Sequence, residues 1–413
     1  METLKPSTRF AISPLFSSQN ITHTSCFIQT PSTLTAIRSF RCSASRPIAE
    51  NSVAVADRLN NPASPWLMLP SEVDENTGQK LDCFYSLADD KILRLNRKKS
   101  LKVPDTAKCI ASTMGWLGFV DTKDCSVYLS NPFLNDVVQL PSLETLPSVL
   151  AVQRDPKTNN ILKFKEDYFP GMPYNQVVYD EFRNLFYTLF DNSGIQAYDL
   201  VRDRGRRSKM VFHITKEMLE SELKQAFEKQ GYEALKALGK RWNRKYYLVT
   251  LQNGELLLIV RQYEIPKAYT YSHTSCEPHK TLQFDVFRVV NPGFLERVTC
   301  LDNDRAIFIG WNQSFCIKAS SSPGVSPNCI YFTDDISNCE DYNVHPNNQW
   351  GHDTGIYRME DATISSCYPY LDKEKEMKAP IPTPLFWVAP LSSCVWYMAR
   401  EHGIDDEKLS VIA

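Results

Sequence analysis

Residues 273–279 contain the densest group of side chains that could bind a metal. His273, Cys276 and His279 follow one another at spacings of three, and such spacings can bring imidazole and thiolate ligands onto one zinc ion. A structural zinc site normally needs a fourth ligand, and no second cluster in the sequence supplies one. We therefore favour polar residues in a connection between strands, with a metal site as the alternative.

Carboxylates and histidines gather a second time between residues 334 and 353. Groups of these types can act as general acid and base or hold a cation. The spacing does not fit a DxDxDG calcium loop, and no nucleophile motif lies beside it. We favour a solvated acidic loop, with a small-molecule or catalytic site as the alternative. The residues are Asp334, Asp335, Glu340, Asp341, His345, His352 and Asp353, beside Trp350.

Two basic runs, 94–99 and 202–207, have side chains that could contact RNA or phosphate. No aromatic platform repeats beside them, as binding of single strands would require. The formal net charge of -2 also gives the chain no overall field that would attract nucleic acid. We expect both runs to be exposed turns, and we find no strong nucleic-acid signal.

Motifs that carry known chemistry are absent: we find no GxSxG, Walker A, GxGxxG or HExxH pattern. We therefore assign no catalytic, cofactor-binding or metal-binding residue and do not expect an enzyme. No apolar stretch approaches the roughly 18 residues of a membrane-spanning helix. The best candidate, Leu256–Val260, is five residues long, so we expect no membrane span.

The first 50 residues differ in composition from the rest of the chain. They are rich in Ser and Thr, and their only acids are Glu2 and Glu50. This hydroxyl-rich, acid-poor pattern is typical of an organellar transit peptide, which we expect to be disordered. Residues 51–64 are polar and read as a linker, followed by one domain over residues 65–413. The basic residues of the leader are Lys5, Arg9, Arg38, Arg41 and Arg46.

The leader indicates an organelle without separating the two possibilities firmly. Arg41 stands just before the small residues Cys42–Ser45, which favours mitochondria over chloroplasts, the alternative. The twelve cysteines are scattered and form no CxxC pair. This pattern suggests neither a disulfide framework nor a thiolate zinc site, but buried apolar cysteines in a reducing compartment.

The remainder of the chain is a succession of short strand-like runs separated by turn residues. Cys83–Leu87 and Cys109–Ser112 are of strand length. Asn253-Gly254 between two β-runs, 246–251 and 255–261, is the strongest hairpin signal in the chain. Later runs at 283–290, 305–311, 314–319, 329–332, 355–358 and 385–388 continue the pattern.

Residues 215–239 are the exception. Leu219, Leu223 and Phe227 share one helical face among strong helix formers, so we expect a short helical insertion. The other runs exceed what one sandwich can hold and predict an all-β fold. A β-propeller with blades of about 40–50 residues gives about six or seven blades.

Several blocks resemble the plant family known as domain of unknown function 295. They are Pro65–Pro70, 115–117 with 129–133, the 247–261 hairpin, 284–290 with 304–310, and 327–335 with 355–357. The resemblance extends from about residue 65 to 390. It implies a KIB-type β-propeller, the domain that in many relatives follows an F-box.

The segment before Trp66 lacks the helical apolar periodicity of an F-box, so the chain resembles an organelle-targeted subgroup without that module. We expect a non-enzymatic organellar platform that binds unknown organellar proteins. Two alternatives remain: a substrate receptor of a ubiquitin ligase, and a propeller enzyme or small-molecule binder that uses the 334–353 region.

Overall fold

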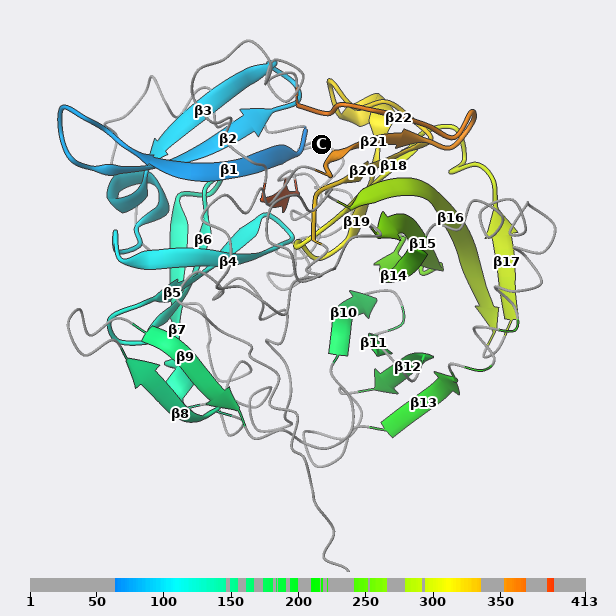
Figure 1. Ribbon diagram of the computed structural model, residues 1–413, viewed down its shortest axis with the longest axis horizontal. Coiled ribbons are helices and arrows are strands. Elements are labelled where there is room, and N and C mark those ends of the chain that lie inside the picture. Colours follow the sequence, from blue (N-terminus) through cyan, green and yellow to red (C-terminus); the bar gives the residue numbers. More distant parts are fainter. Residues whose placement is uncertain are drawn as a thin grey trace, which may run out of the picture.

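Figure 1 shows the computed structural model, in which β-sheets are arranged around a common centre. The structure describes residues 64–145, 149–154, 161–166, 174–180, 183, 185–190, 194–199, 209–215, 217, 221, 241–251, 253–265, 279–291, 294–335, 353–368 and 385–389.

Five sheets of four or five strands form the blades of a β-propeller. Blade 1 contains β23 (Phe386–Val388), β1 (Trp66–Val73), β2 (Lys80–Ser86) and β3 (Lys91–Asn96), and blade 2 contains β4 (Ala107–Thr113), β5 (Trp116–Asp121), β6 (Val127–Asn131) and β7 (Asp136–Leu140). Blade 3 contains β10 (Tyr174–Asp180), β11 (Leu185–Phe190), β12 (Gly194–Asp199) and β13 (Lys209–Ile214). Blade 4 contains β14 (Arg241–Thr250), β15 (Leu256–Ile265), β16 (Lys280–Asn291) and β17 (Phe294–Val298). Blade 5 contains β19 (Phe315–Lys318), β18 (Arg305–Ile309), β20 (Cys329–Phe332), β21 (Gly355–Arg358) and β22 (Thr363–Ser365).

Smaller elements complete the described part. The strands β8 (Val149–Arg154) and β9 (Ile161–Glu166) pair only with each other. One π-helical turn, η2 (Arg97–Leu101), and two 3-10 turns, η3 (Leu143–Thr145) and η4 (Ala319–Ser321), lie between strands. None of the helices in the described ranges is long and apolar enough to cross a membrane.

The propeller fold is confirmed, but the expected number of six or seven blades is wrong, because the described residues form five. The expectation divided the chain by an average blade length. Here β14 and β15 have 10 residues each and β16 has 12, and 14 residues separate β15 from β16. Between blades 2 and 3 the described residues form only the β8–β9 pair. The helical insertion lies almost wholly outside the described residues, as do the leader and most of the linker.

Strand β15 illustrates why these sequences are apolar on consecutive positions. Leu258 and Val260 pack with residues of blade 3 such as Val178 and Ile195. Leu257 and Ile259 point to the other side and pack with residues of blade 5, including Ile307. Because alternate side chains of a strand face opposite sides, a blade between two neighbours buries both faces. The continuous apolar run 256–260 is therefore explained by packing against the two neighbouring blades.

The ring closes between the two ends of the described chain. The late strand β23 pairs antiparallel with β1, with Leu67 opposite Trp387. A buried cluster joins blade 1 to blade 5 beside this contact, with Tyr85, Phe308 and Tyr331 among its members. The hydroxyl of Ser64 also donates to the carbonyl of Pro323. Blade 1 is therefore built from both ends of the domain.

Candidate functional site

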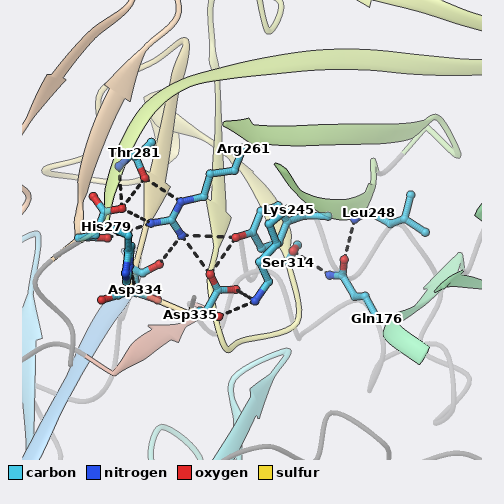
Figure 2. Close-up of polar contacts among 12 residues, drawn as sticks. Gln176, Lys245, Leu248, Arg261, His279, Thr281, Ser314, Asp334 and Asp335 are labelled. Carbon is cyan, nitrogen blue, oxygen red and sulfur yellow. Dashed lines mark hydrogen bonds and ion pairs between the residues drawn. The ribbon is translucent and has the colours of Figure 1, made fainter. Parts of the chain in front are cut away.

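A buried arginine on β15 is the centre of the densest polar cluster in the described residues. The side chain of Arg261 is 0% exposed, although it follows the apolar run of the strand. Its Nε donates to Thr281 Oγ1 at 2.8 Å, and one terminal nitrogen donates to the carbonyl of Thr333 at 2.9 Å. A buried charge is tolerated only when it is paired and its donors are satisfied. Figure 2 shows how these side chains converge.

Two carboxylates of blade 5 neutralise this guanidinium from either side of one connection. Asp335 follows β20, and its Oδ1 lies 3.0 Å from Arg261. Asp353 precedes β21, and its Oδ2 lies 2.9 Å from the other terminal nitrogen, which also donates to the carbonyl of Asp353 at 3.1 Å. Arg261 therefore joins blade 4 to both ends of the β20–β21 connection.

Further residues of blade 4 complete the pairing of these carboxylates. Lys245 of β14 donates to the carbonyl of Asp335 at 2.5 Å and lies 3.0 Å from its Oδ2. The hydroxyl and the backbone N–H of Thr281 both donate to Asp353 Oδ2, at 2.7 and 2.8 Å. His279 Nε2 lies 2.7 Å from Oδ1 of Asp334. Figure 2 shows that Lys245 and Thr281 join the carboxylates that pair with Arg261.

Burial and charge together fix the protonation of the central groups. Burial raises the pKa of Tyr247 well above its usual range, and the neighbouring Asp335 raises it further, so the phenol stays protonated and donates to Asp335 at 2.8 Å. Burial alone would lower the pKa of Arg261, but Tyr247, Asp353 and Asp335 raise it above the ordinary value. The arginine is therefore a permanent cation whose contacts are internal.

The turn between β18 and β19 makes a second set of contacts, near the centre of the ring. The side chain of Asn312 accepts from the N–H of Trp387 in blade 1 at 3.2 Å. Gln313 donates its N–H to the carbonyl of Ser112 in blade 2 at 2.8 Å. Gln176 of blade 3 donates to Ser314 Oγ at 2.8 Å and accepts from the N–H of Leu248. The turn from blade 5 thus contacts three other blades.

The same turn reaches the Arg261 cluster through Trp311. The ammonium of Lys245 lies 5.0 Å from the centre of the Trp311 ring, within the range of a cation–π interaction. Since Lys245 also pairs with Asp335, it connects the central turn to the buried ion pairs. The Lys245 side chain is 28% exposed, which makes it the most accessible charge of the cluster.

The structure brings some of the sequence candidates together and leaves others outside the described ranges. It joins His279 to Asp334, and it joins Asp335 to Asp353 through Arg261. Among the described residues, no three His, Cys, Asp or Glu side chains are grouped as metal ligands. The segments with His273, Cys276, Glu340, Asp341, His345, Trp350, His352 and the run 202–207 lie outside the described residues.

Part of the basic run 94–99 differs from the expectation of an exposed turn. Arg97 is buried and pairs with the buried Asp82, and its guanidinium carbon lies 5.4 Å from the centre of the Phe119 ring. Arg94 does lie at the surface, where it pairs with Glu72 at 2.9 Å. The expectation of a solvated acidic loop is also wrong for Asp334, Asp335 and Asp353, which are buried.

Several residues of the site escaped the sequence analysis. Arg261, Lys245, Thr281 and Gln176 belong to no motif, and their hydrogen-bond partners lie 14 to 138 positions away along the chain. One signal was present. A single arginine directly after the apolar run 256–260 must either end the buried part of the strand or find a buried counter-ion.

The seven described cysteines are all free. Cys83, Cys125, Cys329 and Cys367 are buried, whereas Cys109, Cys300 and Cys316 are partly exposed. Burial raises the pKa of Cys83 to about 11 and that of Cys367 to about 12. These cysteines behave as apolar packing residues within the described domain.

Comparison with known protein families agrees with the β-propeller architecture. The family model described as the KIB1-4 β-propeller matches residues 84–358. This match extends from within β2 to the end of β21 and spans more than half of the chain. A search of curated proteins found no match.

Proposed function

The chain belongs to the KIB1-4 β-propeller family, and on this premise we propose that its propeller is a rigid, non-enzymatic platform that binds another protein inside an organelle. Propellers present loops on a closed scaffold and host many unrelated functions. The fold alone therefore selects no substrate, and the proposal draws on how the buried charges are used.

One observation supports the platform proposal: the buried charges at the candidate site form ion pairs between blades. Arg261, Asp335 and Asp353 are at most 9% exposed and pair with one another. A catalytic site keeps reactive groups open to a substrate, whereas these groups fix one blade against the next. Such a site supports binding by a preformed surface, for which rigidity lowers the entropic cost.

A protein-binding surface can be located by placing a photo-crosslinking amino acid at either end of blade 4. Asn253 lies in the β14–β15 turn, and Lys280 begins β16 at the opposite end of the blade. Both are exposed. We expect one position, in intact organelles, to capture the same protein reproducibly while the other does not. Failure to capture any specific protein from either position would contradict the platform.

The organellar part of the proposal is supported by the composition of residues 1–50. These are rich in hydroxyl side chains and contain two acids and five basic residues, the pattern of a transit peptide. We propose import into mitochondria, with chloroplasts as the alternative. The family match concerns the propeller and leaves this segment to be tested separately.

Import is tested by fusing residues 1–60 to a fluorescent reporter and by mapping the N-terminus of the mature protein. We expect the reporter to enter an organelle and the leader to be cleaved between about Phe40 and Asn51. A second reporter with Arg38, Arg41 and Arg46 replaced by Glu is the matched control and should remain in the cytosol. A wild-type reporter that stays in the cytosol would contradict import and favour the ubiquitin-ligase receptor.

A further inference from the structure

Two connections of the propeller are longer than their strand pairing requires. Phe332 of β20 lies opposite Gly355 of β21, although 22 residues separate them in the sequence. Glu264 of β15 and Lys280 of β16 are paired in the same way. Neighbouring antiparallel strands can be joined by two residues. Strand pairing therefore does not require the length of the β15–β16 connection or of the β20–β21 connection.

The ends of both connections meet in the Arg261 cluster. On blade 4, Arg261 lies three residues before Glu264, and Thr281 directly follows Lys280. On blade 5, Asp335 lies just beyond β20 and Asp353 just before β21. The backbone is held as well, because Arg261 donates to the carbonyls of Thr333 and Asp353. The buried cation at the end of β15 thus contacts the other three ends.

The hydroxyl of Thr281 bridges Arg261 and Asp353 in this network. It accepts from Arg261 Nε at 2.8 Å and donates to Asp353 Oδ2 at 2.7 Å. The residue is 1% exposed, so water cannot readily replace a lost contact. A buried polar network that is only partly satisfied is costly, and the whole arrangement therefore responds when one member is removed.

We propose that the Arg261 cluster is a coupling device that holds the ends of the two connections in a single arrangement. A change at the end of the β15–β16 connection is transmitted through Thr281 and Arg261 to Thr333, Asp335 and Asp353. The coupling is reciprocal, as any coupling free energy must be. It requires no bound partner, so it can be tested separately from the platform function.

The test is amide hydrogen exchange of the full chain after Thr281→Val, a nearly isosteric change. The amide of Thr333 donates to the carbonyl of Ile309, and Gly355 pairs with Phe332, so both amides report on blade 5. We expect their exchange to become about tenfold faster, as a local loss of 1.4 kcal/mol produces. Unchanged exchange at both amides would overturn the proposal.

Two control variants separate coupling from general loss of stability. Thr188→Val makes the same change in blade 3, where the buried hydroxyl has no hydrogen-bond partner in the described structure; it should leave exchange at Thr333 unaltered. Gln262→Met removes a contact of 2.7 Å to Asp285, also on blade 4 and also buried. If Gln262→Met accelerates exchange at Thr333 as much as Thr281→Val does, the effect is general and the proposal fails.

The reciprocal experiment guards against a variant that does not fold. Asp335→Asn keeps the shape of the side chain and an oxygen acceptor while removing the charge. We expect faster exchange at the amide of Thr281, which donates to Asp353 rather than to Asp335. No change there, in a folded Asp335→Asn protein, would show that the two connections are independent.

Discussion

At the scale of single residues, the molecule uses buried charge to join one blade to another. Arg261 is paired with Asp335 and Asp353 across blades 4 and 5, and Arg97 is paired with Asp82 where blade 1 meets blade 2. Such pairs offer modest net stability compared with apolar packing, but removal of one partner leaves an uncompensated buried charge. Their role is to select one arrangement of neighbouring blades.

Arg261→Met should therefore destabilise the protein strongly. The change leaves two buried carboxylates without their cation, and we expect the free energy of unfolding to fall by about 3–5 kcal/mol. Urea unfolding followed by tryptophan fluorescence measures the difference. Arg94→Met is the matched control, because Arg94 is half exposed and pairs with Glu72 at the surface and should change stability by about 1 kcal/mol or less. Similar effects of the two variants would contradict the account.

The buried thiols predict a loss of stability at alkaline pH. Burial raises the pKa of Cys83 to about 11 and that of Cys367 to about 12, from the ordinary 9.0. Below pH 9 the folded and unfolded states both keep these protons. Above it only the unfolded state releases them, so the thiol contribution to stability is lost as pH rises from about 9 towards 12.

Comparison with Cys367→Ala isolates this contribution from other groups that titrate at high pH. The free energy of unfolding of the wild type should exceed that of the variant by more at pH 8 than at pH 10.5. Urea titrations of both proteins at the two pH values give the difference. A difference that does not change with pH would mean that the thiol is not buried in its protonated form.

The site residues were predictable from the sequence only in part. His279, Asp334, Asp335 and Asp353 stand out by type and spacing, but the sequence pattern favoured solvated loops for them. The burial of Asp335 and Asp353 depends on Arg261, which lies 74 positions from Asp335 and 92 from Asp353. No local pattern carries information about a partner at such separations, since hydrophobic periodicity reports only on neighbouring residues.

At the scale of elements, local signals located most strands. The Asn253-Gly254 turn correctly predicted the β14–β15 hairpin, and Cys329–Phe332 and Gly355–Arg358 were predicted with the observed bounds. The strands β7, β8 and β9 were missed. For β7, the burial pattern shows the reason: this outer strand has no fully buried residue, so its sequence lacks the apolar alternation of inner strands.

The turn at Gly324 is an element whose backbone needs glycine. Its φ is +77°, and a Cβ there would collide with the carbonyl of Leu87 in blade 1. We expect Gly324→Ala to lower the melting temperature clearly, because a backbone carbonyl cannot move away as a side chain can. Differential scanning calorimetry measures the shift.

Gly78→Ala provides the control for this prediction. Gly78 has a similar φ of +63°, but nothing lies within 4 Å of a Cβ built there. This variant should therefore show only the backbone cost of about 1 kcal/mol. If the two variants lower the melting temperature equally, the close approach of blades 1 and 5 is not what requires glycine at position 324.

At the scale of the whole molecule, the family match is shorter than the structural unit. The match covers residues 84–358, whereas the ring also needs β1 and β23 to complete blade 1. The number of blades was not predictable from chain length, because long strands and long connections take up residues that an average blade does not contain. The closed architecture itself was predictable from the repeated short strands.

The ring closure predicts different outcomes for two shortened chains. A chain that ends after residue 368 lacks β23 and exposes the edge of β1, so we expect aggregation and loss of a cooperative thermal transition. A chain that ends after residue 389 keeps β23 and should unfold more cooperatively than the shorter chain. Calorimetry and light scattering distinguish the two. Equal behaviour would show that β23 is dispensable for closing the ring.

The position of β23 also determines when blade 1 can be completed during synthesis of the chain. Strand β1 is the first described strand to leave the ribosome, whereas its partner β23 is the last. Blade 1 therefore cannot be completed until β23 has been synthesised, and contacts so distant in sequence form slowly. Closure of the described ring therefore waits until residues 386–388 are available to pair with β1.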